Sequence, residues 1–103
     1  MNEMLSKVSD EVLAIDRLQG NIERLLKVGN FNDGIDRSMN RVQLQDWLQE
    51  ILERMDKVSK LIETNKTLMT ENVIGRNGWT PLFTWMMGIM PWYNEYEAKL
   101  RTI

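Results

Sequence analysis

Apolar side chains recur at heptad spacing in the second third of the chain. From Leu44 to Met69 the steps alternate between four and three residues without a break, as on the face of a helix that packs against other helices. The positions on this face are Leu44, Leu48, Ile51, Met55, Val58, Ile62, Asn65 and Met69. We therefore expect a helix over residues 40–74, ended by Gly75, and we expect this seam to join copies of the chain into an oligomer.

A second stripe of the same period lies nearer the N-terminus. It consists of Leu5, Val8, Val12, Ile15, Gln19, Ile22 and Leu26. The stripe predicts a helix over residues 2–28. Residues 29–39 contain Asn32-Asp33-Gly34, whose residue types favour turns, and they predict the loop between the two helices.

The C-terminal segment, residues 79–103, is rich in Trp and Met. Thr80 suits an N-cap and Pro81 the first position of a helix that continues to residue 90. Pro91 either kinks this helix or begins a second one. The fold predicted for residues 1–103 is a single all-α domain. It is a long helical hairpin or coiled coil, followed by a short aromatic-rich helix.

The second helix is apolar beyond its seam. The flanking positions hold Trp47, Leu52, Leu61, Leu68 and Val73. A face this wide suits a helix with neighbours on two sides, as in a larger bundle. Two seam positions are polar, Gln19 and Asn65. Such residues either set register and oligomeric state or lie at a helix end and meet water.

The amino-acid composition excludes several kinds of catalytic and metal-binding site. The chain of 103 residues has no Cys and no His, which excludes disulfides, thiolate nucleophiles, zinc sites that need sulfur, and histidine acid–base catalysis. The carboxylates recur at ordinary surface spacing, and we expect Asp10, Glu11, Asp16, Glu23, Glu50, Glu53, Asp56 and Glu63 to lie on solvated helix faces. We therefore predict no enzymatic activity, no metal and no cofactor. The net charge of −2 also argues against nucleic acid as a partner.

Tryptophan is concentrated near the C-terminus. Three of the four Trp lie in the 14 residues from Trp79 to Trp92, and no charged residue occurs from Asn77 to Asn94. The apolar run inside this window is short for a membrane span, although aromatic residues at both ends would suit a membrane interface. Flexible Met beside flat aromatic rings suits docking onto a protein. The candidate partner-binding residues are Trp79, Phe83, Trp85, Met86, Ile89, Met90, Trp92, Tyr93 and Tyr96.

These features favour a non-enzymatic assembly or adaptor subunit. Its heptad helices would self-associate, and its C-terminal segment would dock onto a partner protein. Small subunits of large assemblies, including phage particles, have a similar layout. One alternative is a membrane-active protein that inserts residues 79–93, and another is a small inhibitor of a partner enzyme. The N-terminus lacks the pattern of a secretory signal, so we expect the protein in the cytoplasm or within an assembled particle.

Overall fold

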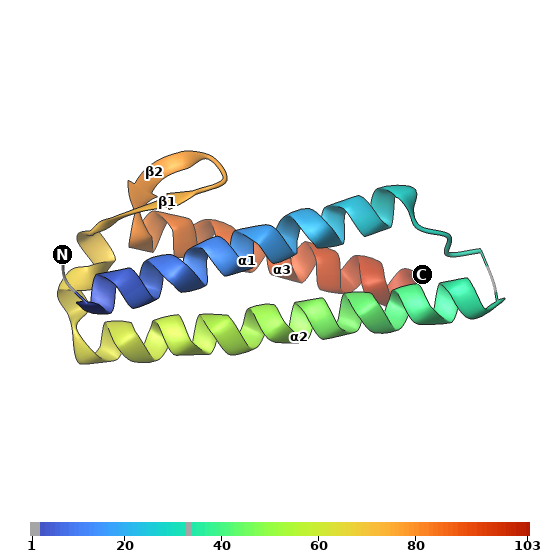
Figure 1. Cartoon of the computed structure of the whole chain (residues 1–103), viewed down its shortest axis with the longest axis horizontal. Helices are drawn as coiled ribbons and strands as arrows, with labels where there is room; N and C mark the ends of the chain where they lie inside the picture. The colour runs from blue at the N-terminus through green and yellow to red at the C-terminus, as the bar shows by residue number, and fades with distance from the viewer. Residues whose placement is uncertain (1–2, 33) are drawn as a thin grey trace.

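The computed structural model describes residues 3–32 and 34–103, which form an elongated bundle of helices with a β-hairpin at one end (Figure 1). Its helices are α1 (Glu3–Val28), α2 (Gly34–Thr64) and α3 (Leu82–Thr102). A 3₁₀ helix, η1 (Lys66–Thr70), and the strands β1 (Asn72–Gly75) and β2 (Gly78–Pro81) connect α2 to α3. The mostly helical fold is confirmed, whereas the small sheet was not predicted.

Helices α1 and α2 run side by side in opposite directions along the long axis of the molecule (Figure 1). The prediction for the first helix is confirmed over the described residues, because α1 begins at Glu3 and ends at Val28. Position 2, where the prediction began, lies outside the described residues. The apolar stripe of α1 is its buried face, with Val8, Val12 and Ile15 fully buried.

The predicted bounds of the second helix are wrong at both ends. It begins at Gly34 rather than at residue 40, so the predicted loop over 29–39 is shorter, and Asp33 of that loop lies outside the described residues. Gly34 has a φ of +82°, a left-handed conformation that glycine adopts at little cost, and it allows the chain to enter the helix directly from the turn.

The helix also ends ten residues early, at Thr64. Asn65 has extended backbone angles, and its side chain accepts a hydrogen bond from the Thr67 backbone N–H as the N-cap of η1. A short amide side chain that bonds to nearby backbone competes with continued helix, which explains the break. Asn65 and Met69 therefore do not belong to the helical seam, although the heptad spacing runs through them.

A two-residue turn of Arg76 and Asn77 joins β1 to β2, with Gly75 paired to Gly78. Gly78 has a φ of +96°, which is in the left-handed region. An Asn-Gly dipeptide is a common hairpin signal because glycine adopts this conformation easily. Val73, in β1, is fully buried and belongs to an apolar cluster of the core. Thr80, the predicted N-cap of the next helix, lies in β2, and Pro81 occupies the cap position without a side-chain hydrogen bond.

Helix α3 continues through Pro91 as one element. It packs against α2, while the hairpin packs against α1, and the core that they enclose consists of two buried apolar clusters, with Trp85 packed against both. The seam of α2 points into this core. Leu44, Leu48, Ile51 and Val58 are 0–3% exposed in the single chain. They contact apolar residues of α1 and α3, so little of their surface remains for a second copy.

Candidate functional site

The predicted partner-binding residues divide between two sides of α3 and the hairpin. Most of them pack toward the core: Met86, Trp85, Ile89, Trp92, Tyr93 and Tyr96 contact the buried clusters. Trp79, Phe83 and Met90 are exposed. The structure therefore does not place all nine side chains on one surface.

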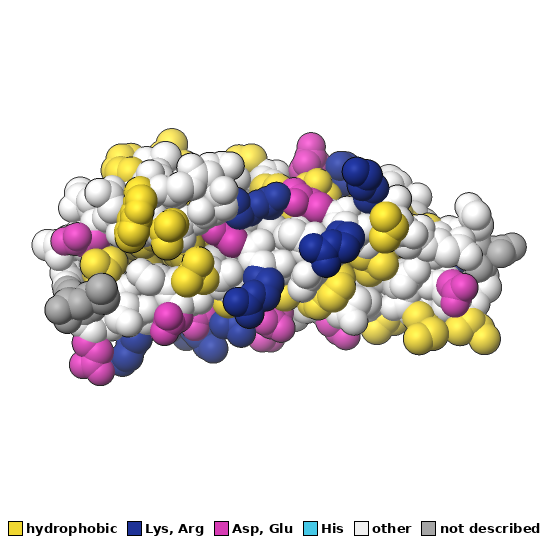
Figure 2. All heavy atoms as spheres, turned by 45° about the horizontal axis from the view of Figure 1, so that its top comes forward, with side chains coloured by type: hydrophobic (Ala, Val, Ile, Leu, Met, Phe, Trp, Pro, Cys, Tyr) yellow, Lys and Arg dark blue, Asp and Glu magenta, His cyan; other side chains and the backbone are white. Residues whose placement is uncertain are grey.

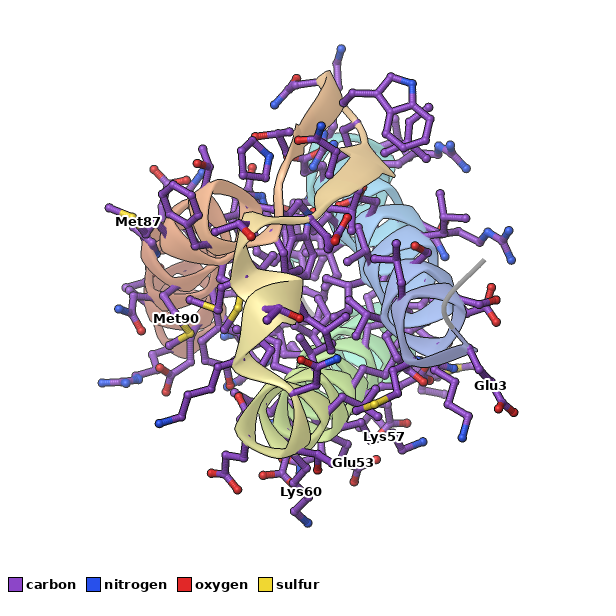
Figure 3. The ribbon with its side chains drawn as sticks, turned by 90° about the vertical axis from the view of Figure 1, so that its left-hand side faces the viewer. Glu3, Glu53, Lys57, Lys60, Met87 and Met90 are labelled. Atoms are coloured by element: carbon purple, nitrogen blue, oxygen red, sulfur yellow. The ribbon has the colours of Figure 1, made fainter. Side chains whose placement is uncertain are left out.

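An exposed apolar stripe runs along the outer side of α3. It consists of Phe83, Met87 and Met90, which are 39%, 71% and 41% exposed. Their spacing of four and three residues places them on one face of the helix. Met87 and Met90 point away from α1 and α2 (Figure 3). We call these three residues the outer stripe; Met87, its most exposed member, was missing from the predicted set.

The C-terminal half of α2 has the opposite character on its outer side. Glu53, Lys57 and Lys60 lie on it and point into solvent (Figure 3). Lys60 forms an ion pair with Asp56 at 2.9 Å, with both side chains largely exposed. A charged face of this kind is an ordinary solvated surface. The N-terminal half of α2 differs, because Ile35, Met39 and Val42 are exposed there.

On the side of α3 opposite the outer stripe, two tryptophans donate hydrogen bonds to α1. The Trp85 indole Nε1 donates to Asp16 at 3.2 Å, and the Trp92 indole Nε1 donates to Glu23 at 3.1 Å. Both pairs of partners are seven residues apart, a separation of about 10 Å along a helix. The two hydrogen bonds therefore form parallel cross-links between α1 and α3, with open space between them.

Arg76, in the hairpin turn, connects the two cross-links. Its backbone N–H donates to Asp16 at 2.9 Å, and its guanidinium forms an ion pair with Glu23. The neighbouring Gly75 lies so close to α1 that a Cβ at this position would be 2.9 Å from an Asp16 carboxylate oxygen. The turn is thus held over α1 by the same acids that bind the tryptophans.

The two acids respond differently to this environment. Burial raises the pKa of Asp16, and the hydrogen bonds from Trp85 and Arg76 offset only part of that effect. Burial alone would also raise the pKa of Glu23, but its hydrogen bonds from Arg76 and Trp92 outweigh burial and lower it. Glu23 is therefore held as a carboxylate at neutral pH.

A groove of about 550 Å³ lies between these cross-links and beneath the hairpin. It is lined by Asp16, Gln19, Glu23, Gly75, Arg76, Asn77, Gly78, Trp79, Thr80, Thr84, Trp85, Gly88, Ile89 and Trp92. A Cβ added at Gly88 would meet nothing within 4 Å, so the wall formed by α3 is open at that point. Figure 2 shows hydrophobic side chains gathered over the hairpin end of the molecule, with Lys and Arg side chains nearer its middle.

Gln19 distinguishes this groove from a simple surface depression. The residue is only 6% exposed and lines the groove. Its side-chain amide makes no hydrogen bond to any other residue in the described part of the chain, and its polar atoms are not among the fully buried ones. The amide therefore has donors and an acceptor that remain available to a polar group in the groove.

The groove was not predicted, because Asp16 and Glu23 were assigned to solvated helix faces. That assignment is wrong for these two acids, which hydrogen-bond to residues more than fifty positions away. One sequence signal could have indicated them: Asp16, Gln19 and Glu23 are spaced by three and four residues, so they share a face of the helix.

Within the ranges 3–32 and 34–103, no group of three acidic side chains lies close enough together to hold a metal ion. In the same ranges, no helix combines the length and the apolar content needed to cross a membrane. Comparison of the chain with protein-family models, curated proteins and solved structures finds no match.

Proposed function

We propose that the protein is a non-enzymatic adaptor or assembly subunit that docks onto a partner protein through the outer stripe of α3. The observation that carries this proposal is the exposure of Phe83, Met87 and Met90 on one face of a helix that packs on the core through another face. No charged residue interrupts this part of the chain, from Asn77 to Asn94. The stripe therefore costs little to remove from water.

The chemistry of the stripe suits a helix that inserts into an apolar groove of a partner. Such interfaces use anchors at positions i, i+4 and i+7, which is the spacing of these three side chains. Methionine adapts its shape to the surface that it meets, and a phenylalanine ring buries a large apolar area at low entropic cost.

We do not propose that the chain self-associates through the heptad residues. Leu44, Leu48 and Ile51 are already buried against other helices of the same chain. A second copy could use the outer stripe instead, and it would then count as one kind of protein partner.

The proposal is tested by affinity capture from extracts of the source cells. We expect a defined protein to bind the tagged wild-type chain and the Lys57→Glu variant, whose substitution lies on the charged face of α2. Met87→Glu should weaken capture about tenfold or more, since truncating one central anchor of an interface often costs 1–2 kcal/mol. Equal capture by all three proteins would contradict the proposal.

Membrane insertion of residues 79–93 predicts a different result. The chain would then float with liposomes and its tryptophan emission would shift to shorter wavelength. An inhibitor would dock through the same stripe, and it would differ only in lowering the activity of the captured partner. Flotation that persists in Met87→Glu, without any captured protein, would replace the docking proposal.

A further inference from the structure

The groove between α1, α3 and the hairpin has an excess of negative charge. Its charged lining residues are Asp16, Glu23 and Arg76, which sum to −1 when all three are ionised. Each carboxylate already accepts bonds on both oxygens, from an indole and from Arg76. A carboxylate oxygen has two lone pairs, so both acids retain acceptor capacity toward a further donor.

Aromatic side chains form the other part of this lining. Trp79, Trp85 and Trp92 all border the groove. Indole is the aromatic group that attracts cations most strongly, and cages of aromatic side chains bind quaternary ammonium ligands in this way. Carboxylates beside indole rings therefore favour a positively charged guest over a neutral or anionic one.

The chain itself places two cations on this aromatic and acidic surface. The Arg76 guanidinium lies against Glu23. Just beyond the groove, the Lys99 ammonium lies 4.5 Å from the centre of the Tyr96 ring, which stacks on Trp92 with ring centres 4.4 Å apart. The surface thus already stabilises both a guanidinium and an ammonium.

Gln19 supplies an independent indication that the groove takes a ligand. The residue is 6% exposed and lines the groove, and its side chain makes no hydrogen bond within the described residues. Gly88 also lines the groove, and the open space at its position leaves room for a guest. A ligand with both a cationic group and a polar group would satisfy this amide and the acids together.

We propose that this groove binds an organic cation, an alkylammonium or guanidinium group, between the cross-links Trp85–Asp16 and Trp92–Glu23. The same chemistry is available from a free small molecule and from a basic side chain of a protein. The site is separate from the outer stripe, because Trp85, Gly88 and Trp92 lie on the opposite side of α3 from Phe83, Met87 and Met90 by helical spacing.

The test titrates the full chain with two cations and their neutral counterparts. Choline is compared with its uncharged isostere 3,3-dimethylbutan-1-ol, and N-acetylarginine amide with N-acetylnorleucine amide. Binding is followed by the NMR signals of the Trp85 and Trp92 indole N–H groups. We expect each cation to bind about tenfold more tightly than its counterpart, as a desolvated cation–π contact allows. Tighter binding of choline would assign a small molecule, and tighter binding of the arginine derivative a basic side chain.

A matched pair of variants tests the acids. Glu23→Gln should weaken cation binding several-fold, whereas Glu97→Gln should not, because Glu97 pairs with Arg101 outside the groove. The comparison of cation with neutral isostere in the wild-type chain needs no variant, so it holds even where Glu23→Gln does not fold. Equal binding of charged and neutral probes, or no shift of either indole signal, would overturn the proposal.

Discussion

At the scale of single residues, Asp16 and Glu23 show how neighbours change the role of a side chain. Both are acids on the first helix, seven positions apart, and either could lie on a solvated face. The hairpin turn and the third helix bring Arg76, Trp85 and Trp92 to them instead. Only the tertiary fold could reveal these partners, because they lie more than fifty residues further along the chain.

Glu23 should make folding stability fall in acid. Its pKa is lower in the folded chain than its ordinary value of 4.5, so its contribution is present above that value and is lost as pH falls through the folded pKa. We expect the free energy of unfolding of Glu23→Gln, measured with urea, to fall less than that of the wild type below about pH 4.5. An unchanged acid slope would contradict this.

Asp16 should act with the opposite sign. Its folded pKa is raised above its ordinary value of 3.8, so its contribution is present below that value and is lost as pH rises through the folded pKa. Asp16→Asn should therefore remove a loss of stability that the wild type shows just above pH 3.8. The same urea series measures it, and a variant with the wild-type pH dependence would show that burial of Asp16 is not the controlling effect.

At the scale of elements, the sequence pattern predicted α1 well and misplaced α2. Apolar periodicity defines α1 because five of the seven stripe residues are buried, and the terminal two, Leu5 and Leu26, are partly buried. The same periodicity continues past Thr64 through Asn65 and Met69, where it no longer reports a helix. The flanking residue Leu68 is still buried, but from a 3₁₀ turn. Hydrogen bonding by the Asn65 side chain ends the helix, and the turn at Asn77-Gly78 forms the hairpin. Heptad spacing of apolar residues contains no information on either feature.

The hairpin depends on the left-handed conformation of Gly78. Gly78→Ala places a Cβ at a φ of +96° and should lower the free energy of unfolding by about 1–2 kcal/mol. Gly20→Ala is a suitable control because Gly20 lies within α1 and a Cβ there meets nothing within 4 Å. That control should raise stability by about 0.5–1 kcal/mol. Chemical denaturation of both variants measures these changes, and a neutral Gly78→Ala would mean that the turn has another conformation.

At the scale of the whole molecule, one chain buries the residues that the heptad pattern assigned to an oligomer. The pattern reports only that a helix face is covered, and it cannot tell whether the covering helix belongs to the same chain. Here α1 and α3 cover it. The candidate site was also predicted only in part. The sequence identified the Trp- and Met-rich segment, but not that one face of α3 forms the outer stripe and the opposite face lines the groove.

Burial of the seam within one chain predicts concentration-independent stability. Ile51→Ala should cost about 2–5 kcal/mol, as for other large-to-small core substitutions, while Val42→Ala, at an exposed position of the same helix, should cost less than about 0.5 kcal/mol. The thermal midpoint of the wild type should not change with protein concentration, because folding then needs no second copy. A midpoint that rises with concentration would indicate that the seam is shared between chains.

Docking through the outer stripe of α3 is the central claim, and photo-crosslinking in the source cells tests it most directly. A photoreactive amino acid replaces Met87 on the outer stripe in one experiment and Lys57 on the charged face of α2 in the other. We predict that position 87 forms a discrete adduct with one protein and that position 57 does not. No protein adduct at position 87, or the same adducts at both positions, would contradict the claim.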